Sequence, residues 1–136
     1  MKHGNVIWFE IPVIDIDRAM IFYSEMLGVT IVKQKLHKTD YGIFDKKKTG
    51  IGGVLVERSE KAGMGVSLFF YVNVLSDAIG SALAHGGKMV TPKTLLKHTN
   101  AEGKTVLAQN LIDNQVGYFA ELLDSEGNQL ALYSHY

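Results

Sequence analysis

The residue types in this sequence limit the chemistry that it could perform. The 136 residues include no cysteine, so the chain has no thiolate nucleophile and no cysteine-ligated metal. Proton transfer would therefore depend on carboxylates or on the five histidines. Glu10 is of interest because Trp8, Phe9 and Ile11 lie beside it in the sequence. If apolar neighbours enclose Glu10, its pKa is raised and it becomes a candidate general base. A solvated glutamate on an open face is the alternative.

Alternation along the apolar runs predicts which side chains share a face with Glu10, because successive strand residues point to opposite faces. In the first run, Phe9 would face a helix, which leaves Trp8 and Glu10 on the other face. The further residues assigned to this face are Phe44, Ser67, Phe69, Tyr71, Phe119, Glu121 and Tyr133. Glu121 supplies a second carboxylate, which would act as a base, pair with Glu10 or bind a lysine.

This predicted face is rich in aromatic side chains. Aromatic walls with a few convergent polar groups are typical of sites for flat or amphipathic small molecules. Trp8, the only tryptophan, offers a large flat surface on which a planar or cationic ligand could stack. Glu10 would supply the charge that orients such a ligand. The alternative is that the aromatic rings only fill a closed interior.

The elements that would position these residues are predicted from the spacing of apolar residues. A helix from about Asp17 to Leu27 ends at Gly28, which favours the left-handed conformation of a helix stop. Its apolar face would consist of Ala19, Phe22, Tyr23 and Met26. A second helix over residues 76–84 would have Ser76 as its N-cap. Strands are predicted near residues 6–11, 29–35, 42–45, 53–57, 66–72, 88–90, 117–123 and 129–134.

The chain repeats itself. A shift of 59 residues superimposes Gly28 on Gly87, and a shift of 75 superimposes residues 42–44 on residues 117–119. The two shifts differ by 16, so the second copy carries 16 additional residues, within about residues 94–114. This insertion would form an extra hairpin or a lid beside a site, with a solvated loop as the alternative. Each copy is predicted to run strand–helix–strand–strand–strand, unless two generic units only resemble each other.

Composition excludes several classes of partner. Fourteen basic and fourteen acidic residues give a formal net charge of zero, which argues against nucleic acids and anionic membranes. The longest charge-free apolar stretch, residues 64–76, is shorter than the ~20 residues of a membrane helix. The hydrophobic fraction of 46% and the length fit one globular domain. We therefore expect a single-domain cytoplasmic protein.

Two motifs resemble those of a known superfamily. The helix segment reads Asp15-x-Asp-Arg-Ala-x-x-Phe-Tyr-x-x-x-Leu-Gly28, and the turn before the last strand reads Leu123-Asp-Ser-Glu-Gly-Asn128. Both resemble the vicinal oxygen chelate superfamily, which includes glyoxalases, bleomycin resistance proteins and extradiol dioxygenases. The resemblance covers almost the whole chain apart from the insertion.

The resemblance implies an α+β fold. Two βαβββ modules in tandem would form an open eight-stranded cup, with the helices outside and the site within. The first module would span residues 4–60, and the second would span residues 65–136 with the insertion at about 94–114.

The resemblance also implies where metal-dependent members hold a divalent ion. The four matching positions here are Trp8, Val56, Ser67 and Ala131. None of these side chains is a ligand that such an ion prefers. The histidines, for which we expect exposed structural roles, are His3, His37, His85, His98 and His135. We therefore expect no metal and no cofactor.

Three functions stay open at this point. The first is metal-free binding of a small organic molecule in the aromatic-lined cup, as bleomycin resistance proteins do by sequestration. The second is a glyoxalase-like isomerase or lyase that uses Glu10, Glu121 or a displaced divalent metal. The third is a protein-interaction module whose cup is filled by its own side chains. Because sheet edges must be covered, and members of the resembled superfamily commonly cover theirs with a second copy, we also expect a homodimer.

Overall fold

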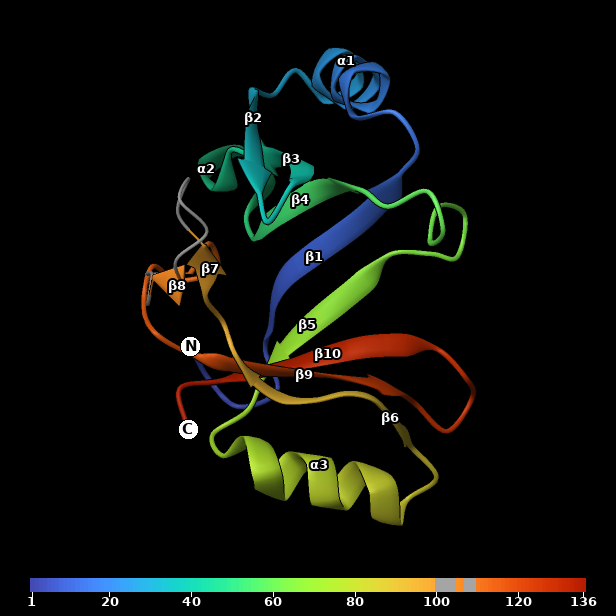
Figure 1. Ribbon diagram of the computed structural model, residues 1–136, viewed down its shortest axis with the longest axis vertical. Coiled ribbons are helices and arrows are strands. Elements are labelled where there is room, and N and C mark those ends of the chain that lie inside the picture. The colour runs from blue at the N-terminus through green and yellow to red at the C-terminus, as the bar shows by residue number, and fades with distance from the viewer. Residues whose placement is uncertain (100–104, 107–109) are drawn as a thin grey trace. The chain divides into compact units, whose positions relative to one another are not determined.

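The computed structural model of the chain describes residues 1–99, 105–106 and 110–136 (Figure 1). Its internal contacts divide the chain into two compact units. One unit is Trp8–Val66, and the other combines Met1–Ile7 with Ser67–Tyr136. The predicted module limits, 4–60 and 65–136, stay a prediction.

The unit Trp8–Val66 is a four-stranded mixed sheet with one long helix. Its elements are β1 (Val6–Val13), apart from the first two residues of that strand, α1 (Ile16–Leu27), β2 (Ile31–Leu36), β3 (Thr39–Phe44), α2 (Lys46–Thr49) and β4 (Gly52–Glu57). The strand order is β2-β3-β4-β1, in which β1 and β4 are parallel and the other neighbours are antiparallel. The short helix α2 was not predicted from the sequence.

The other unit repeats this arrangement. Its elements are β5 (Ser67–Tyr71), α3 (Leu75–Ala84), β6 (Lys88–Leu95), β7 (His98–Thr99), β8 (Thr105–Val106), β9 (Tyr118–Leu123) and β10 (Gln129–Ser134). The strand order is β5-β10-β9-β6, again with one parallel pair, β5 and β10. Strands β7 and β8 pair antiparallel, as the hairpin alternative for the insertion predicted. Residues 100–104 and 107–109 of the predicted insertion lie outside the described residues. The predicted fold class, α+β with two βαβββ modules in tandem, is confirmed.

Helix α1 begins and ends where the chain supplies partners for its terminal backbone groups. The Asp15 side chain accepts a hydrogen bond from the Arg18 amide at 3.0 Å, as an N-cap does. Glu57, at the end of β4, accepts a second one from the Ile16 amide at 3.0 Å. Gly28 then ends the helix in the left-handed conformation, with a φ of 65°. The predicted stop at Gly28 is correct.

The buried side of α1 differs in part from the predicted one. The core between α1 and its sheet is built around the buried residues Ile16, Phe44 and Leu55. The partly buried residues packed against them are Phe9, Ile11, Val13, Ala19, Met20, Tyr23, Val29 and Ile31. Ala19 and Tyr23 therefore face the sheet as predicted. Phe22 and Met26 do not, because they are 58% and 57% exposed. Ile16 and Met20 complete the buried face in their place.

Helix α3 begins one residue before its predicted start. Its N-cap is Val74, which makes no side-chain hydrogen bond, so the prediction of Ser76 as the N-cap is wrong. The earlier start places Leu75, which has no exposed surface, in the core with Val72, Ala120, Leu122 and Leu132. The start of α3 is therefore held by burial of Leu75 and not by a side-chain hydrogen bond at the N-cap.

The motif before the last strand is a turn held by its own aspartate. The Asp124 carboxylate accepts hydrogen bonds from the amides of Glu126 and Asn128, each at 2.8 Å, and from the Asn128 side chain at 3.1 Å. The hydrogen bonds from Asn128 are the main cause that lowers the pKa of Asp124. Gly127 has a φ of 88°, which the turn requires and which glycine adopts without strain.

The repeat holds for the helices, but its later register differs from the predicted one. Ile16 and Leu75 each begin a helix, at the predicted shift of 59. Strand pairing then makes Val54 equivalent to Ala131, a shift of 77, and Tyr41 equivalent to Phe119, a shift of 78. The predicted shift of 75 is therefore wrong for both strands. An error of two residues keeps the face of a side chain, whereas an error of three reverses it.

Along the described part of the chain, no helix is both long and apolar enough to cross a membrane.

Leu75→Ala tests the core beneath α3. Removing this fully buried side chain should lower the free energy of unfolding by about 2–5 kcal/mol. Leu83→Ala is the matched control, because Leu83 lies on the same helix but is 46% exposed. Its effect should be about 1 kcal/mol or less. Urea unfolding followed by circular dichroism measures both values, and equal losses would contradict this description of the core.

Candidate functional site

Trp8 and Glu10 lie on the face of their sheet that points away from α1, as predicted. Phe9, between them, packs beneath the helix, so strand alternation turns the other two to the opposite face. Trp8 is 5% exposed, and its ring covers Gly52, its register partner on β4. A β-carbon at Gly52 would collide with the indole, so this glycine provides the space for the tryptophan.

Glu10 has a cationic neighbour that the sequence did not reveal. Nη1 of Arg58 lies 3.8 Å from Oε2 of Glu10, and both side chains are partly exposed. Nη2 of Arg58 also donates a hydrogen bond to the hydroxyl of Tyr41 at 3.4 Å. The carboxylate is thus held beside a guanidinium next to a buried indole. The expectation that Glu10 acts as a base stays a prediction.

The structure corrects the predicted position of Phe44. Its ring makes edge contacts with Phe9 and Tyr23, at centroid distances of 5.2 and 5.9 Å, in the core beneath α1. Phe44 therefore does not share a face with Trp8 and Glu10. The cause is the register error of three residues, because the true equivalent of Phe119 is Tyr41.

The other unit places its predicted residues on one face. Phe70, Val72, Leu122 and Leu132 pack in the core beneath α3. The alternate residues therefore point away from the helix, and they are Ser67, Phe69, Tyr71, Phe119, Glu121 and Tyr133. Glu121 accepts a hydrogen bond from the Gln129 side chain at 2.8 Å. The face assignments in this unit are confirmed, and the ligand-binding roles stay predictions.

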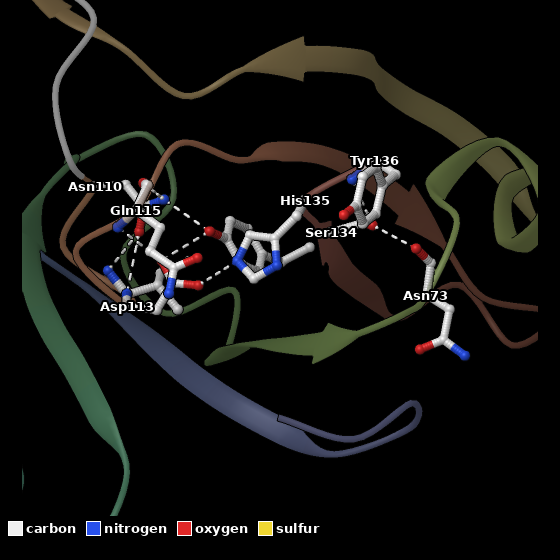
Figure 2. A network of polar contacts seen from close by, with 9 residues as sticks. Asn73, Asn110, Asp113, Gln115, Ser134, His135 and Tyr136 are labelled. Atoms are coloured by element: carbon white, nitrogen blue, oxygen red, sulfur yellow. Dashed lines mark hydrogen bonds and ion pairs between the residues drawn. The ribbon is translucent and has the colours of Figure 1, made fainter.

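A cluster that the sequence analysis missed lies at one end of this face (Figure 2). Asp113, from the insertion, accepts a hydrogen bond from the Tyr133 hydroxyl at 2.9 Å, and its other oxygen lies 2.7 Å from Nε2 of His135. The Asp113 side chain is 9% exposed and that of His135 is 26% exposed. The His135 ring contacts the rings of Tyr71 and Tyr133 at centroid distances of 5.7 and 5.6 Å. The prediction that His135 is exposed is therefore wrong, and its role stays a prediction.

A tight turn presents Asp113 to these partners. Oδ1 of Asn110 accepts hydrogen bonds from the amides of Ile112 and Asp113, and its Nδ2 donates to the carbonyl of Gln115 and to the hydroxyl of Tyr133. The phenol of Tyr133 thus receives one hydrogen bond and donates another to Asp113. Burial raises the pKa of Tyr133, so this phenol keeps its proton and remains a donor.

Together these contacts form an Asp–His pair of the kind that can move a proton. A carboxylate bound to one imidazole nitrogen fixes the tautomer and orientation of the ring, which leaves the other nitrogen to accept a proton. Here Asp113 binds Nε2 of His135, so Nδ1 is the nitrogen left for a ligand. Strand alternation could have placed His135 on the face of Tyr133. No sequence signal indicated that Asp113 would meet them.

An apolar cavity of about 310 Å³ lies on the opposite side of this sheet. It opens between α3 and the strands, and its walls include Phe70, Ala78, Ala82, Leu130 and Leu132. None of the predicted site residues borders it.

In residues 1–99, 105–106 and 110–136, no three His, Asp or Glu side chains gather closely enough to hold a metal ion. The expectation of a metal-free protein stays a prediction.

Comparisons with known proteins agree with this geometry. Residues 5–40 match the family described as bleomycin resistance protein-like N-terminal. Three solved structures are similar along nearly the whole chain. A hypothetical protein from Bacillus halodurans has a TM-score of 0.62 at 14% identity, covering 99% of this chain and 96% of its own. Methylmalonyl-CoA epimerase from Mycobacterium tuberculosis has a TM-score of 0.59 at 14% identity, with coverages of 98% and 88%.

The third structure is a methylmalonyl-CoA epimerase from Streptomyces coelicolor, with a TM-score of 0.59 at 12% identity and 98% of each chain covered. This chain has the fold of the vicinal oxygen chelate superfamily. None of the curated proteins matches it. The predicted fold of this superfamily is therefore confirmed, and at these identities the similarity to the solved structures concerns the fold alone.

Gly117→Ala tests whether Tyr133 depends on the residue before β9. A β-carbon at Gly117 would collide with the phenol ring of Tyr133, which is fully buried. The variant should therefore lose about 1–3 kcal/mol of unfolding free energy, because the ring or the strand must move. Gly80→Ala is the control, since Gly80 is an exposed residue of α3 with open space around it. That variant should gain up to about 1 kcal/mol. A neutral Gly117→Ala in thermal unfolding would contradict the placement of Tyr133.

Proposed function

We propose that this vicinal oxygen chelate superfamily protein binds a small organic molecule without a metal ion. The observation that carries the proposal is the placement of aromatic side chains in both modules on the sheet face opposite the helix. Trp8 lies on this face in one module, and Phe69, Tyr71, Phe119 and Tyr133 lie on it in the other. Aromatic surfaces with few polar groups favour flat or amphipathic ligands. The match to the bleomycin resistance protein-like family supports sequestration as the function.

The side chains at the positions implied for a metal do not fit one. Indole, hydroxymethyl and alkyl groups occur at Trp8, Ser67, Val56 and Ala131. With the corrected register, the equivalent of Ala131 is Val54, which is also alkyl. Divalent ions prefer imidazole and carboxylate ligands. This donor set therefore supports a binding protein that does not use the metal of its superfamily. A cytoplasmic location is part of the same proposal.

Glu10 and its neighbours indicate the chemistry of the ligand. A carboxylate beside a buried indole favours a ligand that combines a planar ring with a cationic group, since the ring can stack and the cation can bind the carboxylate. Arg58, 3.8 Å from Glu10, keeps the carboxylate in place before a ligand arrives. Glu10 is then an orienting group for the ligand.

Trp8 provides the signal for a test of ligand binding. A panel of planar cationic aromatic compounds should contain members that change the fluorescence of Trp8, which no other tryptophan masks. Glu10→Gln should raise the dissociation constant of such a compound about tenfold, through loss of the charged hydrogen bond. Glu60→Gln, an exposed glutamate of the same unit, should leave the constant unchanged. Calorimetric binding that neither alters Trp8 fluorescence nor depends on Glu10 would contradict the proposed site.

One observation favours a second function, an enzyme that transfers a proton. The pair of Asp113 and His135 has the geometry of an oriented general base, at 2.7 Å. In this function His135 removes a proton from a carbon or oxygen of the ligand, and Asp113 holds the ring and stabilises the imidazolium that forms. The predicted bases Glu10 and Glu121 would not be needed.

The ring opening of nitrobenzisoxazole tests this second function, because the reaction needs only a positioned base and its substrate is flat and aromatic. The base takes the ring C–H proton, the N–O bond breaks, and a nitrile and a phenolate form. His135→Gln should lower the rate about 100-fold towards the solution rate. His85→Gln is the control, since the imidazole of His85 binds the Ser81 carbonyl at the end of its own helix. Equal rates for the wild type and His135→Gln would exclude His135 as a base for this reaction.

A further inference from the structure

The outward face of α1 is apolar where a surface helix is usually polar. Ile21 is 65% exposed, Phe22 is 58% exposed and Met26 is 57% exposed. A helix on the outside of a sheet normally presents charged and polar side chains to solvent. Contiguous exposed apolar residues mark an interaction surface. We call Ile21, Phe22 and Met26 the α1 patch.

Two opposite charges lie on either side of Ile21 and Phe22, the central part of this patch. Arg18 and Glu25 are seven residues apart, which is close to two turns, so both lie on the outward face at a spacing of about 10 Å. The midpoint between them falls between Ile21 and Phe22. Among the described residues neither side chain has an ion-pair partner, whereas the neighbouring Asp17 is paired with Lys33 at 2.9 Å.

We infer that α1 is the surface on which a second copy of this chain docks, with the two α1 helices antiparallel. A two-fold axis through the midpoint of the patch places Arg18 opposite Glu25 of the partner subunit, and Glu25 opposite the partner's Arg18. The apolar patches then cover each other at the centre. A helix with one charge at each end of an apolar stretch is complementary to itself only in this antiparallel orientation.

The charge balance supports a second copy as the occupant. The chain has a net charge of zero, so two copies approach without long-range repulsion. Arg18, then Ile21 and Phe22, then Glu25 give the order positive, apolar, negative along α1, which is complementary to the same order read in reverse. A twelve-residue helix is about 18 Å long, so a pair of such helices buries less than the ~1,600 Å² of a standard interface. The dimer should therefore dissociate in the micromolar range.

Charge reversal at two residues provides the test. Sedimentation equilibrium of the full chain, up to about 100 µM, should show a monomer–dimer equilibrium. Arg18→Glu and Glu25→Arg should each raise the dissociation constant at least about tenfold, since each converts two attractive pairs into two repulsive ones. A mixture of the two variants should form a heterodimer about as stable as the wild type, because both of its charge pairs are attractive.

Two further variants separate this surface from others. Ile21→Gln should also weaken the dimer while leaving the unfolding free energy nearly unchanged, since Ile21 lies outside the core. Lys47→Glu reverses an exposed charge on α2 and should have no effect on the dimer.

A wild type that stays monomeric at the highest concentration would overturn the inference. A dimer whose dissociation constant is unchanged by both charge reversals would also overturn it, because the contact would then lie elsewhere. The same holds if the mixture of Arg18→Glu and Glu25→Arg forms no heterodimer. Ligand binding by the Trp8 and Glu10 face is unaffected by these outcomes, since α1 lies on the other side of its sheet.

Discussion

Each four-stranded sheet has to bury one face against a helix, and this requirement decides what the other face can carry. In the first unit the apolar residues of β1, β3 and β4 that alternate with Trp8 and Glu10 are used beneath α1. In the second unit the leucines of β9 and β10 are used beneath α3. The residues on the opposite face point away from the helix, so helix packing does not determine their types. In the second unit they include four aromatic side chains, whereas in the first unit Trp8 and Tyr41 lie among aliphatic residues such as Val54 and Val56.

Strand alternation and helix spacing were sufficient to predict most of this division. In the runs around Trp8, Phe69 and Tyr133 one polar residue, which is Glu10, Ser67 or Gln129, marks the face away from the helix, so the faces could be predicted from one sequence. Phe44 could not be placed in this way, because its face depended on the alignment of the two copies, and three residues of slip reverse a side chain. The apolar face of α1 was misjudged for a related reason. Phe22 and Met26 look like core residues by type, but Ile16 and Met20 fill the space beneath the helix.

The Asp113–His135 contact shows the other limit of sequence reasoning. The two residues are 22 positions apart, and the first belongs to an insertion that has no counterpart in the other module. Its position depends on Asn110, whose amide side chain holds two amides of the turn and the Tyr133 hydroxyl at once. It also depends on a glycine, Gly117, that leaves room for a phenol ring. Such a network depends on several contacts at once, and no single sequence motif predicts it.

The corrected register also relates the residues that follow the last strands of the two modules. A shift of 77 makes Arg58 the counterpart of His135, each in the position that follows the last strand of its module. Arg58 there lies beside Glu10, and His135 lies beside Asp113. The two matching positions thus hold a guanidinium in one module and an imidazole in the other, and each lies beside a carboxylate. The same point of the repeated fold therefore carries a cation beside a carboxylate in one module, and in the other an imidazole ring that lies against a carboxylate and two phenol rings.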